Sequence, residues 1–201
     1  MNLRHKYMLG CAVLLIVSPI FLSAISSDNI TATDWTYRHL LWIDLYLKGD
    51  FSPVEVYLPL FHWIMLPFVA ISFPMKYFQV VFVLLSVFGI LYYAHKKESD
   101  ETVLYTAIML ASSIAFVEFA GSLMPQALDY LFFPLACMFY YQKRVKSMAA
   151  MLIMDFLMHP TGLMFAAILL IHTIITKRWR EAKWLLVMSL LMAPIFYYYI
   201  F

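Results

Sequence analysis

Apolar residues form long runs along this chain, separated by short polar segments. The first run, from Tyr7 to Ser26, has 20 residues, matching the roughly 20 that a helix needs to cross a bilayer. It is longer than the ~7–15-residue core of a signal peptide, so a retained first span is predicted. Further apolar or weakly polar stretches follow near residues 57–74, 77–94, 103–119, 127–141, 147–158, 161–176 and 184–201.

Charged and apolar positions alternate with helical spacing in the segment after the first run. Thr33 is a suitable N-cap for a helix from Asp34 to Lys48, because its hydroxyl can accept a hydrogen bond from a first-turn amide. At 100° per residue, four charged positions fall within one arc of about 120°, and they are Asp34, Arg38, Asp44 and Lys48. Apolar and aromatic residues cover the remaining arc, so we expect this helix to lie in a membrane interface.

The stretch at 57–74 decides the predicted topology. If it does not cross, 11 of the 14 Lys and Arg residues share one side with the N-terminus. If it crosses, that distribution inverts, against the excess of Lys and Arg found in cytoplasmic loops. Three prolines, Pro59, Pro67 and Pro74, also favour breaks over one continuous helix. We therefore predict a re-entrant or interfacial element at 57–74.

These patterns predict an all-α fold: a polytopic membrane helical bundle of about seven transmembrane helices. Residues 1–201 would form a single transmembrane domain, with a cytoplasmic N-terminus. Residues 27–76 would form an external loop that holds the interfacial amphipathic helix and the re-entrant segment. The expected location is the plasma membrane, or the endoplasmic reticulum if the source is eukaryotic, with the lipid bilayer as a partner.

Composition agrees with a lipid environment. Hydrophobic residues make up 64% of the chain and charged residues 13%, where a soluble domain has about 25% charge. The two cysteines, Cys11 and Cys137, lie inside apolar runs, so neither a disulfide framework nor a cysteine-rich metal site is supported. Nothing in the sequence points to a nucleic-acid partner.

Acids and histidines collect on the predicted external side. His62 lies in an apolar stretch, where a histidine is more often a hydrogen-bonded core residue than a ligand. Asp129 and Glu118 flank a short external segment. Ionisable groups at membrane depth are costly and face a cavity or a partner by default, so structural and functional uses of these carboxylates stay open.

The run from 147 to 158 is too short to cross a bilayer. Its 12 residues make about 18 Å of helix, whereas the hydrocarbon core is about 30 Å thick. The following turn at 159–162 should therefore lie below the membrane surface, where only protein or a water-filled cavity can cover it. Asp155 lies one helical turn before His159 and could orient the imidazole or pair with it.

The order of these features resembles the GT-C superfamily of membrane glycosyltransferases and the related EpsG/Wzy-type polysaccharide polymerases. The resemblance rests on five segments and one glycine: residues 34–37 (DWTY), Gly49, 57–63 (YLPLFHW, similar to a YPPLxxW stretch), 124–129 (MPQALD), 142–144 (QKR) and 157–162 (LMHPTG). Leu58 replaces the second proline of the YPPL pattern. The chain has 201 residues, whereas members of these families usually run to several hundred.

The resemblance implies a function and a set of site residues. It implies sugar transfer from a polyprenyl-phosphate-linked donor to an acceptor on the extracytoplasmic face. Asp34 would be the catalytic carboxylate, while His62, Asp129 and His159 would contact substrate. Arg38 joins them by helix spacing alone. Metal ligands cannot be assigned from the sequence, although a divalent ion would supply the positive charge that is scarce on this side.

Two other classes of function stay open at this stage. A transporter or lipid flippase would explain carboxylates near membrane depth, although the chain lacks the internal repeat of many secondary transporters. A non-catalytic assembly subunit, or an enzyme that needs a second membrane subunit, would explain the short length. The enzyme interpretation is favoured without excluding either.

Overall fold

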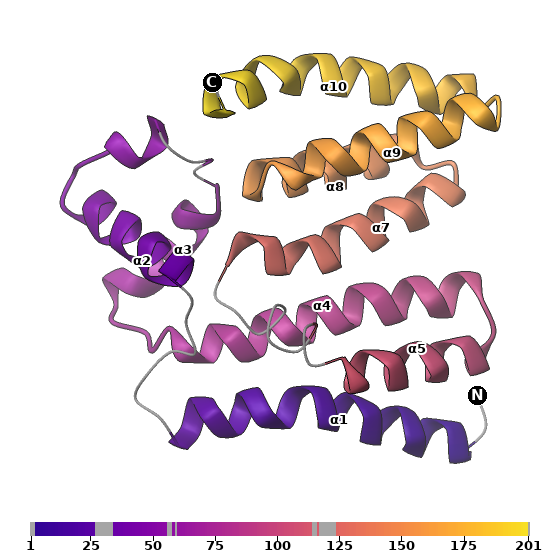
Figure 1. Ribbon diagram of the computed structural model, residues 1–201, viewed down its shortest axis with the longest axis horizontal. Helices are drawn as coiled ribbons and strands as arrows, with labels where there is room; N and C mark the ends of the chain where they lie inside the picture. The colour runs from indigo at the N-terminus through magenta and orange to yellow at the C-terminus, as the bar shows by residue number, and fades with distance from the viewer. Residues whose placement is uncertain are drawn as a thin grey trace.

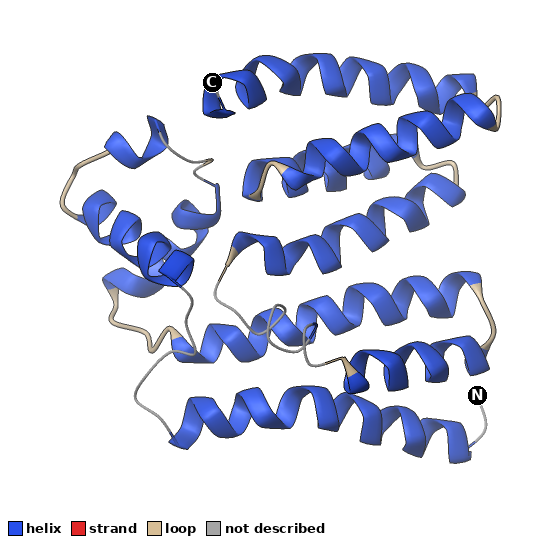
Figure 2. Ribbon diagram, in the orientation of Figure 1, coloured by secondary structure: helices blue, strands red, loops and turns tan. Residues whose placement is uncertain are grey.

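The computed structural model describes residues 3–26, 34–55, 58, 60–113, 116 and 124–200. All regular secondary structure in these ranges is helical (Figure 2). In chain order the elements are α1 (Leu3–Ser26), α2 (Asp34–Leu47), the 3-10 helix η1 (Ser52–Glu55), α3 (Leu60–Ala70), α4 (Lys76–Lys97), α5 (Asp100–Ser112), the 3-10 helix η2 (Pro125–Leu128), α7 (Asp129–Tyr141), α8 (Val145–Met158), α9 (Thr161–Ile175) and α10 (Trp179–Ile200).

The longer helices lie side by side in a stack, with α1 at one edge and α10 at the other (Figure 1). Helices α1, α4 and α5 pack on one another, and α7, α8, α9 and α10 form a second group. The contact between α4 and α7 joins the two groups. Helices α2 and α3 pair with each other at one end of the stack, where α3 also contacts α8.

Two glycines permit close approaches between these helices. A Cβ at Gly89 of α4 would lie 2.6 Å from Leu131 Cα in α7, and one at Gly162 of α9 would lie 2.3 Å from the Phe156 amide nitrogen in α8. Real Cβ atoms do not approach backbone so closely, so only glycine fits either position. Gly162 thereby holds the start of α9 against the end of α8.

The helix expected over 34–48 is confirmed as α2, which ends one residue earlier, at Leu47. The i,i+4 pair Asp44–Lys48 also forms, at 2.5 Å.

Helix α3 has 11 residues, about 17 Å at 1.5 Å per residue, so it is too short to cross a bilayer alone. Pro67 lies inside α3 and does not end it, contrary to the expected break.

The structure confirms the all-helical fold class. Among the described residues, α4 is the one helix that is long and apolar enough to cross a membrane by itself. Helix α8 extends to 14 residues, roughly 21 Å, which is still short of a ~30 Å hydrocarbon core. The seven crossings stay a prediction.

The basic loops lie together at one end of the stack. The N-terminus, the α4–α5 turn, the α7–α8 turn and the α9–α10 turn are all at the end opposite α2 and α3 (Figure 1). We call this the basic end. The other end, which carries α2, α3 and the α8–α9 turn, is the histidine end.

Candidate functional site

A group of buried and half-buried polar side chains lies at the histidine end. We call it the histidine–carboxylate cluster, and its members come from α2, α3, α7, α8, the α8–α9 turn and α9: His39, His62, Asp129, Asp155, His159 and Thr161. Five helices and one turn contribute, so the cluster exists only in the folded chain.

Two histidines form the part of the cluster nearest α2 and α3. His39 Nδ1 lies 2.9 Å from His62 Nε2, and His39 and His62 are 1% and 0% exposed. Trp42 packs edge-on against both imidazoles, with ring centroids 5.2 Å from His39 and 5.4 Å from His62. One imidazole donates and the other accepts in this contact, so both rings are held in fixed orientations.

Burial makes both imidazoles weak bases. Desolvation and the neighbouring His62 and His159 lower the pKa of His39 to about 3. Desolvation also lowers the pKa of His62 to about 4, with a hydrogen bond to the Leu58 backbone acting in the opposite direction. Both rings are therefore neutral near pH 7 and can each supply one N–H donor and one nitrogen acceptor. The effect of His159 on His39 also places that third histidine close to the pair.

A hydrogen-bonded chain runs from His159 to Asp129. Thr161 Oγ1 donates to Asp129 Oδ2, and His159 Nδ1 lies 2.7 Å from Thr161 Oγ1. The Thr161 amide also donates to His159 Nδ1, at 3.3 Å. This chain connects an imidazole to a carboxylate through one hydroxyl.

Asp155 is the most deeply buried acid of the cluster, with 0% exposure. Its carboxyl group interacts with that of Asp129. Apart from that of Asp129, no described side chain forms a hydrogen bond with either Asp155 oxygen. Buried polar groups that lack their full set of partners are uncommon in stable proteins and call for an explanation such as a functional role. The expectation that Asp155 orients or pairs with the His159 ring stays a prediction; the contact found is between backbones, where the His159 amide donates to the Asp155 carbonyl at 2.8 Å.

Local sequence features position these side chains. Pro125 starts η2, whose last residue leads directly into Asp129 at the first turn of α7. The Ser86 hydroxyl of α4 lies 2.8 Å from the Ala127 carbonyl and so ties η2 to α4. In the α8–α9 turn, Gly162 lets α9 start close to the α8 backbone. These contacts fix Asp129 and the His159 turn relative to each other.

An apolar cavity of about 250 Å³ adjoins the cluster between α3, α4 and α7. Phe61, Leu128 and Met158 line it, and each directly precedes a cluster residue: His62, Asp129 and His159. Most of the other lining side chains are phenylalanine, isoleucine, leucine or valine. The site thus combines polar groups with an adjoining space suited to an apolar chain.

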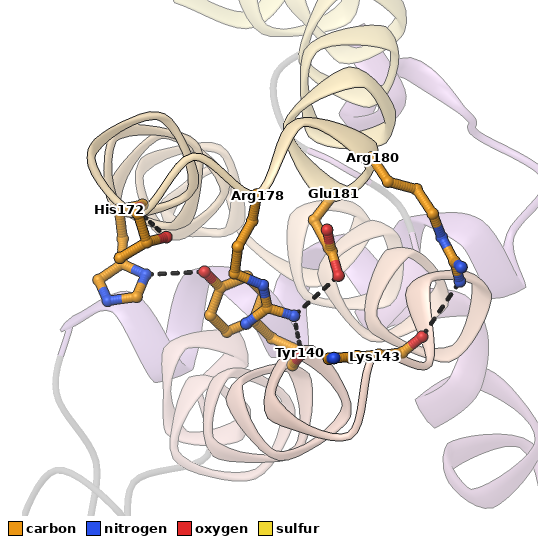
Figure 3. A network of polar contacts seen from close by, with 7 residues as sticks. Tyr140, Lys143, His172, Arg178, Arg180 and Glu181 are labelled. Carbon is orange, nitrogen blue, oxygen red and sulfur yellow. Dashed lines mark hydrogen bonds and ion pairs between the residues drawn. The ribbon is translucent and has the colours of Figure 1, made fainter.

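The basic end holds a different polar network (Figure 3). Arg178 donates to the Tyr140 carbonyl at 2.7 Å and to Glu181 Oε1 at 2.8 Å, and its guanidinium lies 3.8 Å from the centroid of the Tyr140 ring. The Tyr140 hydroxyl lies 2.8 Å from His172 Nδ1. Burial raises the pKa of Glu181, but hydrogen bonds and the charges of Arg178 and Arg180 outweigh it and lower that pKa overall.

Three of the five site residues expected from the sequence belong to the cluster: His62, Asp129 and His159. Arg38 lies on the exposed face of α2. Asp34 begins α2, but its side chain is outside the described residues, so its predicted place in the same cavity as His159 stays a prediction.

Sequence reasoning missed His39 and Thr161. His39 shares the buried face of α2 with Ile43 and Tyr46, at spacings i+4 and i+7, so its position on an apolar face was a usable signal. Thr161 follows His159 by two residues and carries no comparable signal.

No three His, Cys, Asp or Glu side chains are grouped to hold a metal ion within the described parts of the chain. The Asp34 side chain lies outside that comparison. Searches against protein-family models, curated proteins and solved structures found no match to this chain. The site must therefore be interpreted from its own geometry.

Proposed function

We propose that this protein is an integral membrane glycosyltransferase of GT-C type that takes a sugar from a polyprenyl-phosphate-linked donor on the extracytoplasmic face. A bilayer location is supported by large hydrophobic side chains on the outer surface, such as Leu14 at 66%, Ile175 at 73% and Leu191 at 71% exposure. Soluble monomers rarely expose apolar patches of more than a few hundred Å². Helix α4 adds a segment that could cross alone.

The observation that carries the proposal is the apolar cavity beside the histidine–carboxylate cluster. A polyprenyl-phosphate sugar has an apolar tail and a polar head, and these two adjoining environments match its two parts. His39 and His62 are neutral near pH 7, and their mutual contact occupies one nitrogen of each ring, so this pair adds polarity to the cluster without adding charge.

In the proposed reaction, a hydroxyl oxygen of the acceptor attacks the anomeric carbon of the donor sugar. The bond from that carbon to the phosphate oxygen breaks, and the polyprenyl phosphate leaves. The hydroxyl proton passes to a carboxylate, which we assign to Asp34 with Asp129 as the second candidate. A carboxylate is a suitable base here because it takes up the proton as the new bond forms.

The test replaces each carboxylate by its amide and measures sugar transfer from radiolabelled polyprenyl-phosphate sugars in membranes. Asp34→Asn is expected to lower transfer by about 10²-fold or more without lowering protein abundance. Asp129→Asn tests the second candidate in the same assay. The matched control is Asp44→Asn, which removes an exposed carboxylate of α2 that pairs with Lys48, and its transfer should be unchanged. Full activity in both Asp34→Asn and Asp129→Asn would contradict the proposal.

A proton-coupled transporter or lipid flippase is the second candidate. It is favoured by the interacting carboxyl groups of Asp129 and Asp155, because paired intramembrane acids are typical of proton pathways. Purified protein in liposomes separates the two functions. Movement of a fluorescent lipid-linked sugar across the bilayer, without any transferred product, would favour the flippase.

A further inference from the structure

A second cavity, of about 540 Å³, lies at the basic end between the start of α8 and the start of α10. Four cationic side chains line it together with one tryptophan, and we call it the basic pocket: Lys143, Arg144, Lys146, Arg180 and Trp184. Arg180 donates to the Lys143 carbonyl at 3.3 Å, which connects the α7–α8 turn to α10 across the pocket (Figure 3).

The positive charge of this pocket is only partly balanced by the described residues, because Glu181 interacts with Arg180 alone among the four lining cations. Residues 140–150 contain no acid, and residues 176–184 contain one, Glu181. Glu181 is bound by Arg178, which does not line the pocket. The four lining cations form no ion pair with the described residues. Such a concentration of unbalanced charge favours binding of an anion.

The backbone of α8 adds hydrogen-bond donors to the same pocket. Val145, Lys146 and Ser147 form its first turn and line the cavity, and the N-cap residue Arg144 makes no side-chain capping bond. First-turn amides have no acceptor within their own helix. They therefore supplement the four cations as donors to an anionic group.

An apolar stripe leads away from the pocket along α10. Arg180, Trp184, Val187 and Leu191 are spaced i, i+4, i+7 and i+11, so they share one face of the helix. All four are exposed, and the last three are apolar. A ligand whose anionic group occupied the pocket would have its remaining part beside this stripe.

We propose that the basic pocket binds the phosphate of an anionic phospholipid, whose acyl chains lie along the Trp184–Leu191 face of α10. Continuity between the cationic pocket and the apolar stripe selects a lipid over a free phosphate, which would use only the pocket. The tryptophan lies where the two environments meet, as is common at membrane interfaces. This proposal rests on the proposed membrane location but does not depend on sugar transfer.

The test uses the full chain in neutral detergent and native mass spectrometry with added phosphatidylglycerol or phosphatidylcholine. The wild type should retain phosphatidylglycerol in preference to phosphatidylcholine. Arg144→Gln/Lys146→Gln should weaken this binding by about tenfold or more, because each Lys or Arg beside an anionic surface contributes roughly a factor of five. The matched control Lys96→Gln/Lys97→Gln removes two cations at the same end of the bundle, outside the pocket, and should bind as the wild type does.

A charge-preserving variant, Arg144→Lys/Lys146→Arg, separates binding from folding and should keep most of the affinity. Equal losses in the pocket and control variants would overturn the site, as would unchanged binding in the pocket variant. Full displacement of the lipid by millimolar inorganic phosphate would overturn the lipid assignment in favour of free phosphate. If the wild type retained the lipid but transferred no sugar, that result would contradict the proposed enzyme and leave the lipid-binding proposal standing.

Discussion

Buried polar groups have different kinds of partner at the two ends of the helical stack. At the basic end, Glu181 is bound by Arg178, and the Arg178 guanidinium is also stacked on Tyr140. At the histidine end, Asp155 is fully buried, and the side chain that its carboxyl group contacts is another acid, Asp129. One end follows the rule that buried polar groups are satisfied, and the other departs from it.

This difference indicates which end is under functional constraint. A paired and stacked network stabilises the fold and needs no other explanation. A buried acid beside a second acid lowers stability, and proteins retain such arrangements mainly where chemistry or binding requires them. The contrast therefore supports the proposal of a site at the histidine end without any use of a family resemblance.

The largest effect is expected from Gly162→Ala, which disturbs the turn that supports the cluster. The added methyl would lie 2.3 Å from the Phe156 amide nitrogen, so α8 and α9 must separate. We expect a loss of about 3 kcal/mol of unfolding free energy, at the upper end of the usual cost of overpacking. Thermal unfolding in detergent measures it. Gly10→Ala is the control, because nothing lies within 4 Å of its added Cβ, and unchanged or slightly higher stability is expected there.

Arg178→Ala is expected to have the next largest effect. It removes the ion pair to Glu181, the hydrogen bond to the Tyr140 carbonyl and the stacking on that ring. Because Glu181 is then left buried without its partner, we expect a loss of about 2 kcal/mol in the same unfolding measurement. Arg180→Ala, an exposed neighbour with one 3.3 Å bond, should change stability by less than about 0.5 kcal/mol. A loss as large as that of Arg178→Ala would show that general charge, rather than the network, stabilises this end.

Amide substitutions of the two buried acids should change stability in opposite directions. Asp155→Asn gives Asp129 an N–H donor that needs no bound proton, whereas the two acids must take up a proton on folding to bond to each other, so unfolding free energy should rise by about 1 kcal/mol. Glu181→Gln weakens the bond from Arg178 and should lower it by a similar amount. Unfolding curves of both variants, measured beside that of the wild type, give the sign of each change in unfolding free energy. If both variants lose stability, the contrast between the two ends is wrong.

The smallest effect concerns pH. His39 and His62 have folded pKa values of about 3 and 4, below the unfolded value of about 6.5. Well above pH 6.5 both rings are neutral in both states; below it the unfolded chain binds protons first, so stability falls by about 1 kcal/mol for the two rings together as the pH drops from 6.5 to 6. We expect a decrease of several degrees in the unfolding midpoint across that range. His39→Gln/His62→Gln should remove most of this dependence and leave the part from His159, whose pKa burial also lowers to about 4, whereas His95→Gln, an exposed residue of α4, should not change it.

Much of the fold could be predicted because long apolar runs and amphipathic spacing are local properties of the sequence. The helix from Asp34 was predicted for this reason. Pro67 was misjudged because packing against neighbouring helices can keep a helix continuous through a proline, as at Pro134 of α7 and Pro194 of α10. Element boundaries and the effect of one proline depend on packing that the sequence does not display.

The candidate site could be predicted only in part for a related reason. His62, Asp129 and His159 stand out as polar residues in apolar surroundings. The contact between His39 and His62 requires α2 and α3 to pack together, and the Asp129–Asp155 contact requires α7 to lie beside α8. These are tertiary relations between residues 23 and 26 positions apart, and periodicity within one helix carries no information about them.

The contact at Gly89 has a consequence for how the protein is assembled. Helices α1, α4 and α5 contact one another, helices α7 to α10 contact one another, and α4 meets α7 and η2 where Gly89 and Ser86 lie one turn apart. During synthesis α1, α4 and α5 can therefore pack together before α7 to α10 emerge from the ribosome. The glycine then lets the second unit dock at a single axial position, because a larger residue would hold the two backbones apart. The chain can be regarded as two modules whose pairing is a late and separable step of biogenesis.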